Sequence, residues 1–65
     1  MNTLTKKQET QIIIKLNNIF QQQMNGWNKT KNEKYLQNSQ EAINLLSDMG
    51  INTYEKQMSI YAARD

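Results

Sequence analysis

The chain contains no histidine and no cysteine, so its six carboxylates are the best candidates for catalytic side chains. They are Glu9, Glu33, Glu41, Asp48, Glu55 and Asp65. Acid–base and nucleophilic catalysis rely mostly on an imidazole, a thiolate or a matched carboxylate pair. Glu41 and Asp48, seven residues apart, share one side of a helix but lie about two turns from each other. We therefore predict no coupled pair, no catalytic residue and no enzyme activity.

Tyr54, Tyr61 and Lys56 are a second conceivable acid–base set. Helical spacing puts both tyrosines on the apolar face of their segment and Lys56 off that face, which favours core packing over catalysis. The absence of cysteine and histidine also removes the usual zinc ligands. We predict neither a metal nor a cofactor.

The basic segment 26–34 carries a different chemistry. It combines Trp27 with Lys29, Lys31 and Lys34. Lysines attract phosphates, and an aromatic ring can stack on a nucleobase. Arginine, the commonest base-reading side chain, occurs only at Arg64. Nucleic-acid binding through these four residues is therefore our alternative function, beside the interpretation that they cap and solubilise a helical bundle.

Charge is unevenly distributed along the chain. The segment Met1–Lys34 carries six lysines against two glutamates, a net +4, whereas Tyr35–Asp65 carries two basic against four acidic residues, a net −2. Such asymmetry is typical of a polyanion-binding end. It is equally typical of complementary halves that pack together or pair between chains.

Three helices are expected from the spacing of the apolar residues. The first begins at Thr5, which forms a capping-box pattern with Gln8, and runs to about residue 24. Its apolar face spans roughly 140° on a helical wheel. That face comprises Ile12, Ile13, Leu16, Ile19, Phe20 and Met24. Gly26 and the surrounding asparagines predict a loop over residues 25–30.

The second helix is predicted over residues 31–49 and the third over residues 53–63. The sequence Met49-Gly50-Ile51 fits a Schellman stop, with Gly50 in the left-handed position. Asn52 and Glu55 are plausible capping residues for the third helix. Its predicted apolar face comprises Tyr54, Met58, Tyr61 and Ala62.

The sequence predicts a single all-α domain over residues 1–65, a small bundle of two main antiparallel helices plus a shorter C-terminal third helix. The expected core comprises Ile12, Ile13, Leu16, Ile19, Phe20, Leu36, Ile43, Leu46, Met49, Ile51 and Met58. A 65-residue domain buries only about 60% of its unfolded surface. Domains of this size often rely on disulfides, metals or oligomerisation, and with no cysteine we expect a homodimer.

Three apolar residues fall off the predicted core faces: Ile14, Leu45 and Ile60. We predict that they form a seam for a protein partner, so that the chain acts as a small protein-interaction module. Its composition, rich in asparagine, glutamine and lysine, is typical of AT-rich genomes and suggests an accessory or inhibitory protein of a bacterium, phage or plasmid. Because residues 1–7 do not resemble a signal peptide and no apolar run is long enough to span a membrane, we expect a cytoplasmic protein.

Overall fold

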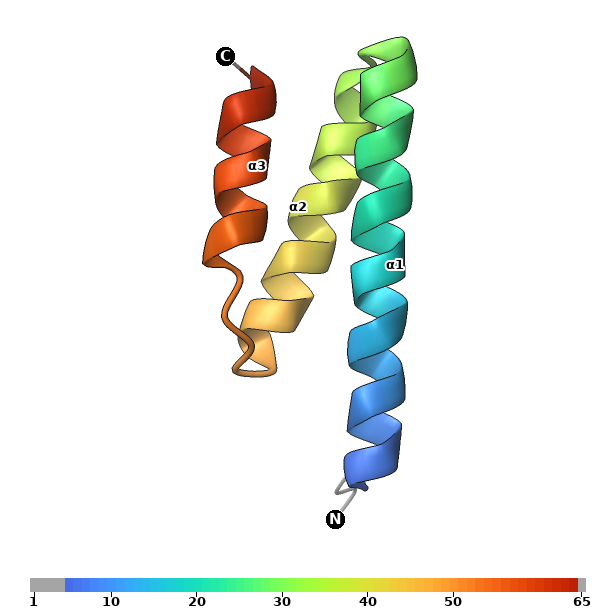
Figure 1. Ribbon diagram of the computed structural model, residues 1–65, viewed down its shortest axis with the longest axis vertical. Helices are drawn as coiled ribbons and strands as arrows, with labels where there is room; N and C mark the ends of the chain where they lie inside the picture. The colour runs from blue at the N-terminus through green and yellow to red at the C-terminus, as the bar shows by residue number, and fades with distance from the viewer. Residues whose placement is uncertain (1–4, 65) are drawn as a thin grey trace.

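The computed structural model describes residues 5–64 as three α-helices joined by two short turns (Figure 1). They are α1 (Lys6–Thr30), α2 (Glu33–Asp48) and α3 (Tyr54–Arg64). α2 lies between α1 and α3 and runs antiparallel to both. This arrangement confirms the predicted all-α fold of two main antiparallel helices and a shorter third. Asp65, one of the six carboxylates, lies outside the described residues.

Local capping interactions set where the helices begin. At α1 the predicted capping box is confirmed: Gln8 N donates to Thr5 Oγ1 and Thr5 N donates to Gln8 Oε1, both at 3.1 Å. Asn32 caps α2, its Oδ1 accepting from Lys34 N at 3.0 Å. Asn52 Oδ1 accepts from the backbone N of Tyr54 at 3.0 Å, at the start of α3. These polar side chains satisfy backbone donors that a helix start leaves free.

The predicted Schellman stop at the end of α2 is also confirmed. Ile51 N donates to Leu46 O at 3.1 Å, and Gly50 N donates to Ser47 O at 2.9 Å. Gly50 has a φ of 82°, in the left-handed region that glycine adopts most easily. A Cβ at Gly50 would meet no atom within 4 Å, so the backbone angle alone explains the glycine.

The predicted loop over residues 25–30 was wrong, because α1 continues to Thr30 and ends at a left-handed Lys31 with a φ of 57°. Gly26 lies inside the helix. A Cβ at this position would come within 2.5 Å of two ring carbons of Tyr35 on α2. The glycine therefore permits close packing of two helices and does not form a turn.

Side-chain contacts fix the register of the antiparallel helices. Asn38 Nδ2 donates to Gln23 Oε1 at 3.2 Å, and Gly26 packs against Tyr35, so facing residues of α1 and α2 have numbers that sum to 61. In this register the end of α2, Asp48, lies level with Ile13. α1 therefore continues past the α2–α3 turn, as Figure 1 shows, and the molecule extends to 42 Å along its longest axis.

The core is built mainly on α2. Its buried residues come from all three helices: Leu16, Phe20, Leu36, Ser39, Ala42, Ile43, Leu46 and Ile60. Five predicted core residues are confirmed as buried, namely Leu16, Phe20, Leu36, Ile43 and Leu46. Four more are half-buried, namely Ile13, Ile19, Met49 and Ile51. The prediction was wrong for Ile12 and Met58, which are 37% and 46% exposed.

Candidate protein-binding surface

The side of α3 that carries Ile60 packs against α1 and α2. Its side chain is 1% exposed and packs in a cluster with Phe20 of α1 and with Ala42 and Ile43 of α2. The prediction that Ile60 lies off the core and binds a partner was therefore wrong. A residue this buried contributes to folding and offers no surface to a partner.

Polar contacts to α2 hold α3 in the same rotation. Gln40 Nε2 donates to Gln57 Oε1 at 2.7 Å, and Gln57 Nε2 donates back to Gln40 Oε1 at 2.9 Å. Nearer the end of α3, Arg64 forms an ion pair with Glu33 at the start of α2. Gln57, Ile60 and Arg64 are spaced i, i+3 and i+7, so a single face of α3 makes all of these contacts.

The other side of α3 is left open. Tyr54, Met58 and Tyr61 are 68%, 46% and 55% exposed. Their i, i+4, i+7 spacing puts them on one face of the helix, and we call these three residues the α3 stripe. The sequence prediction puts Met58 in the core and the two tyrosines on the same apolar face, because three large side chains outweigh the lone Ile60 on a helical wheel; the exposure of all three shows that this face is not packed.

The residue types in the α3 stripe are those that protein interfaces favour. Tyrosine and methionine are enriched in the buried centres of interfaces, and tyrosine is common among the residues that dominate binding energy. Methionine also adapts its flexible side chain to varied partner surfaces. The stripe thus combines two amphipathic aromatic rings with one adaptable apolar side chain.

Ile14 and Leu45, the other two residues of the predicted seam, are exposed as expected, at 54% and 53%. They belong to different helices. Helical phase puts Ile14 on the side of α1 opposite the buried Leu16, so it points away from α2, which carries Leu45. The three predicted seam residues therefore do not lie on one continuous surface.

The residues of the alternative nucleic-acid site gather around the α1–α2 turn. Lys29, Lys31 and Lys34 are exposed, whereas Trp27 is half-buried. The Lys31 Nζ lies 5.3 Å from the centroid of the Trp27 ring, within the range of a cation–π contact. Part of the tryptophan ring is therefore already in contact with a lysine of its own chain, and base stacking there stays a prediction.

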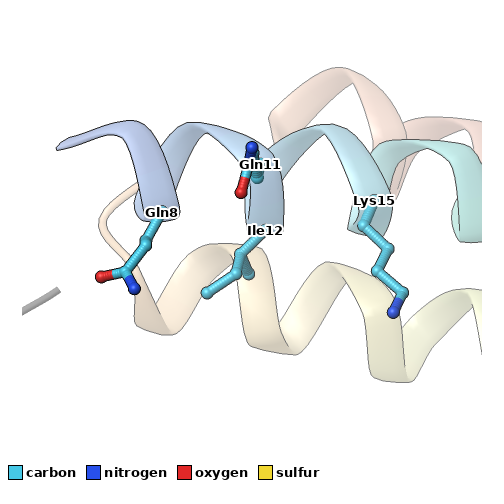
Figure 2. Close-up of a pocket in the computed structure, with 4 residues that line it drawn as sticks. All are labelled: Gln8, Gln11, Ile12 and Lys15. Carbon is cyan, nitrogen blue, oxygen red and sulfur yellow. The ribbon is translucent and has the colours of Figure 1, made fainter. Parts of the chain in front are cut away.

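The surface of residues 5–64 includes two shallow hollows of similar volume. The first, of about 320 Å³, is lined by four residues of α1: Gln8, Gln11, Ile12 and Lys15. Figure 2 shows Gln8, Ile12 and Lys15 leaving the same side of the helix. The second, of about 330 Å³, lies at the start of α3 and is lined by Asn52, Tyr54, Glu55 and Lys56. Each is lined by a single short stretch of chain, unlike the enclosed, mostly apolar pockets that bind small molecules.

Two negative findings apply to residues 5–64. No group of three or more acidic, histidine or cysteine side chains comes together there in a way that would hold a metal ion. None of the helices in this range is both long enough and apolar enough to cross a membrane.

Comparison with known proteins adds no functional information. No protein family model matches the chain, and neither the curated proteins nor the solved structures gave a match. The functional inference therefore rests on the surface of the molecule itself.

Proposed function

We propose that this protein acts by binding another protein, without catalysing a reaction, and that the α3 stripe is its main contact surface. One observation carries the proposal. α3 buries Ile60 against the core while it leaves three large side chains, Tyr54, Met58 and Tyr61, exposed.

The energetics of a small domain support this proposal. Fully burying an apolar side chain of this size contributes about 1.5–3 kcal/mol. A domain of this length gains little stability from its own core, yet the stripe contributes little to that core. Contiguous exposed apolar patches on small proteins are often binding sites.

Two kinds of partner fit this proposal. One is a different protein, in keeping with an accessory or inhibitory role in a bacterium, phage or plasmid. The other is a second copy of the chain, which would make the protein a homodimer through the same surface. Both forms cover the α3 stripe with apolar atoms, and the experiment below separates them by mass.

Site-specific photo-crosslinking tests the proposal. A benzophenone amino acid replaces Tyr61, and in a matched control it replaces Gln22, which is exposed on α1. Each variant is irradiated in lysate of the source cells, with and without nuclease. We expect a discrete protein adduct from position 61 that survives nuclease and is absent from position 22. An adduct of twice the chain's own mass would identify a second copy as the partner.

Three results would contradict the proposal: no adduct at position 61, equal adducts at both positions, or adducts that disappear after nuclease treatment. The last result would favour the nucleic-acid alternative at Trp27, Lys29, Lys31 and Lys34. Affinity for nucleic acid would then fall steeply as salt concentration rises.

A further inference from the structure

The exposed charges are unevenly distributed among the helices, with Lys34 and Arg64 as the exposed basic residues of α2 and α3. The exposed charged residues of α1 are Lys6, Lys7, Lys15 and Lys29 against Glu9. Between residues 35 and 63 the exposed charged residues are all acidic, namely Glu41, Asp48 and Glu55. Lys56 is half-buried, and Arg64 at the end of α3 is paired with Glu33. Of the two exposed charged residues of α3, Arg64 is thus paired with Glu33, and Glu55 is the one that lies near the α3 stripe.

Glu55 borders the α3 stripe directly. It precedes Met58 by three residues, about one helical turn, so the two side chains are neighbours on the helix surface. The hollow at the start of α3 is lined by Tyr54 and the exposed Glu55, together with Asn52 and the half-buried Lys56. A partner that covers Tyr54 would place its own flanking groups near this carboxylate.

We infer that the α3 stripe binds a basic amphipathic helix of another protein, an inference that rests on the proposed function and specifies its partner. A stripe at i, i+4, i+7 presents the spacing by which one helix packs along another. Lysine or arginine beside the apolar face of the partner would meet Glu55. The same cations would also be attracted to the exposed faces of the two tyrosine rings.

A second copy of this chain offers a poorer match than a foreign helix. The basic helix of the chain is α1, and the apolar residues of α1 mostly face α2. The exposed isoleucines of α1, Ile12 and Ile14, are two residues apart and therefore lie on opposite sides of the helix, so each is a single apolar side chain on its face. A single isoleucine cannot cover a stripe that is two helical turns long.

Two synthetic peptides test the inference. One is an 18-residue helix with leucine at i, i+3, i+4 and i+7 and lysine at its flanking positions; the other has glutamate in place of every lysine. Each carries a fluorophore, and binding to the full chain is followed by anisotropy. We expect the basic peptide to bind at least about tenfold more tightly than the acidic one.

Two variants in the α3 stripe region, each with a matched control on α1, test where the basic peptide binds. Glu55→Lys should weaken binding of the basic peptide by about three- to tenfold, whereas Glu9→Lys, the same charge change on α1, should leave it unchanged. The double change Tyr54→Ser and Tyr61→Ser should weaken it by more than tenfold, whereas Ile14→Ser should not. Circular dichroism confirms that each variant is folded.

Each contrary result has a definite meaning. Equal binding of both peptides, or equal effects of Glu55→Lys and Glu9→Lys, would overturn the charge assignment. Unchanged binding in the double tyrosine variant would overturn the stripe as the site. If neither peptide binds while crosslinking at position 61 still gives an adduct, the inferred basic helix is wrong but the proposed protein-binding function stands.

Discussion

Ile60 and Tyr61 are neighbours in the chain with opposite surroundings, since Ile60 is 1% exposed and Tyr61 is 55% exposed. One step along a helix turns a side chain by about 100°, which is enough to separate the packed face of α3 from its open face. The proposed function depends on this one angular difference. A rotation of α3 by one residue would bury the stripe and remove the surface.

Gly26 is a second residue whose surroundings decide its effect. Gly26→Ala would gain about 1 kcal/mol of helix propensity. It would also force a methyl group against the half-buried ring of Tyr35. We expect the clash to outweigh the gain, so that the variant loses stability in urea denaturation.

The Tyr35→Ala background tests this explanation of Gly26. With the ring removed, Gly26→Ala should change sign and stabilise the protein by about 1 kcal/mol. The control compares the two single variants with the double variant in one thermodynamic cycle. Stabilisation by Gly26→Ala in the presence of Tyr35 would show that the two residues do not pack closely.

Asn17 lowers the stability of the fold, and a substitution should remove this effect. Its Oδ1 is buried and accepts no hydrogen bond from residues 5–64. Replacing an unsatisfied buried polar group with an apolar one of similar size removes a penalty of about 1–3 kcal/mol. Asn17→Leu should therefore raise the melting temperature by about 4–8 °C for each kcal/mol gained. The neighbouring exposed Asn18→Leu serves as the control, and an equal gain there would contradict the explanation.

At the scale of the helices, α3 is the element most dependent on its contacts. It has 11 residues, and isolated helices shorter than about 12–15 residues are marginal in water. Its packed face consists of Ile60, the amide pair of Gln57 with Gln40, and the ion pair of Arg64 with Glu33. Loss of one such contact should therefore affect α3 before it affects α1 and α2.

Gln57→Ala tests the docking of α3. The change removes both hydrogen bonds of the amide pair and leaves Gln40 without its interhelical partner. We expect a loss of about 1–2 kcal/mol, seen as roughly tenfold faster hydrogen exchange of the α3 amides. Gln21→Ala is the control, because Gln21 Nε2 makes only an exposed bond within α1, to Asn25 Oδ1. Equal acceleration in all three helices would contradict independent docking of α3.

The sequence predicted those element boundaries that depend on local chemistry. The capping box at Thr5 and the Schellman stop at Gly50 need only residues three to five positions apart, and both were confirmed. Gly26 was misread as a turn former because its role depends on Tyr35, which belongs to the next helix. Local patterns cannot show such a contact.

The face of α3 was mispredicted for a related reason. Hydrophobicity alone favours burial of Tyr54, Met58 and Tyr61 over a single isoleucine. In the observed rotation Ile60 packs against Phe20, Ala42 and Ile43, and two polar pairs join α3 to Gln40 and Glu33, which lie 17 and 31 residues away from their partners in the sequence. Apolar residues on two different faces of one short helix, Ile60 on one and Tyr54, Met58 and Tyr61 on the other, are the sequence signal that the buried face was ambiguous.

At the scale of the whole molecule, the fold is elongated, with extents of 42 × 18 × 16 Å. No residue of α1 from Lys6 to Lys15 is buried; Leu16 is the first that is. This part of α1 passes the end of α2 (Figure 1). It adds length to the molecule while it contributes little to the core.

Truncation tests that account of the shape. Removal of residues 1–9 leaves Thr10 in place to cap the shortened helix. Because surface changes away from the core are usually worth less than about 0.5 kcal/mol, we expect the melting temperature to fall by about 4 °C at most. Removal of residues 1–19, which deletes the buried Leu16, is the comparison and should abolish cooperative unfolding. A large loss from the shorter truncation would show that the exposed part of α1 is needed for folding.

We assign one face of α3 to packing on the core and another to binding a partner. Two variants, Ile60→Ser and Tyr61→Ser, are the most direct test of this assignment. Thermal unfolding and capture of the partner found by crosslinking are measured for each variant. Ile60→Ser should lose about 2–5 kcal/mol, the cost of a large-to-small change in a core. Tyr61→Ser should unfold at nearly the wild-type temperature and still lose capture. A folded Ile60→Ser protein with wild-type stability, or a Tyr61→Ser protein that unfolds or captures normally, would contradict the arrangement.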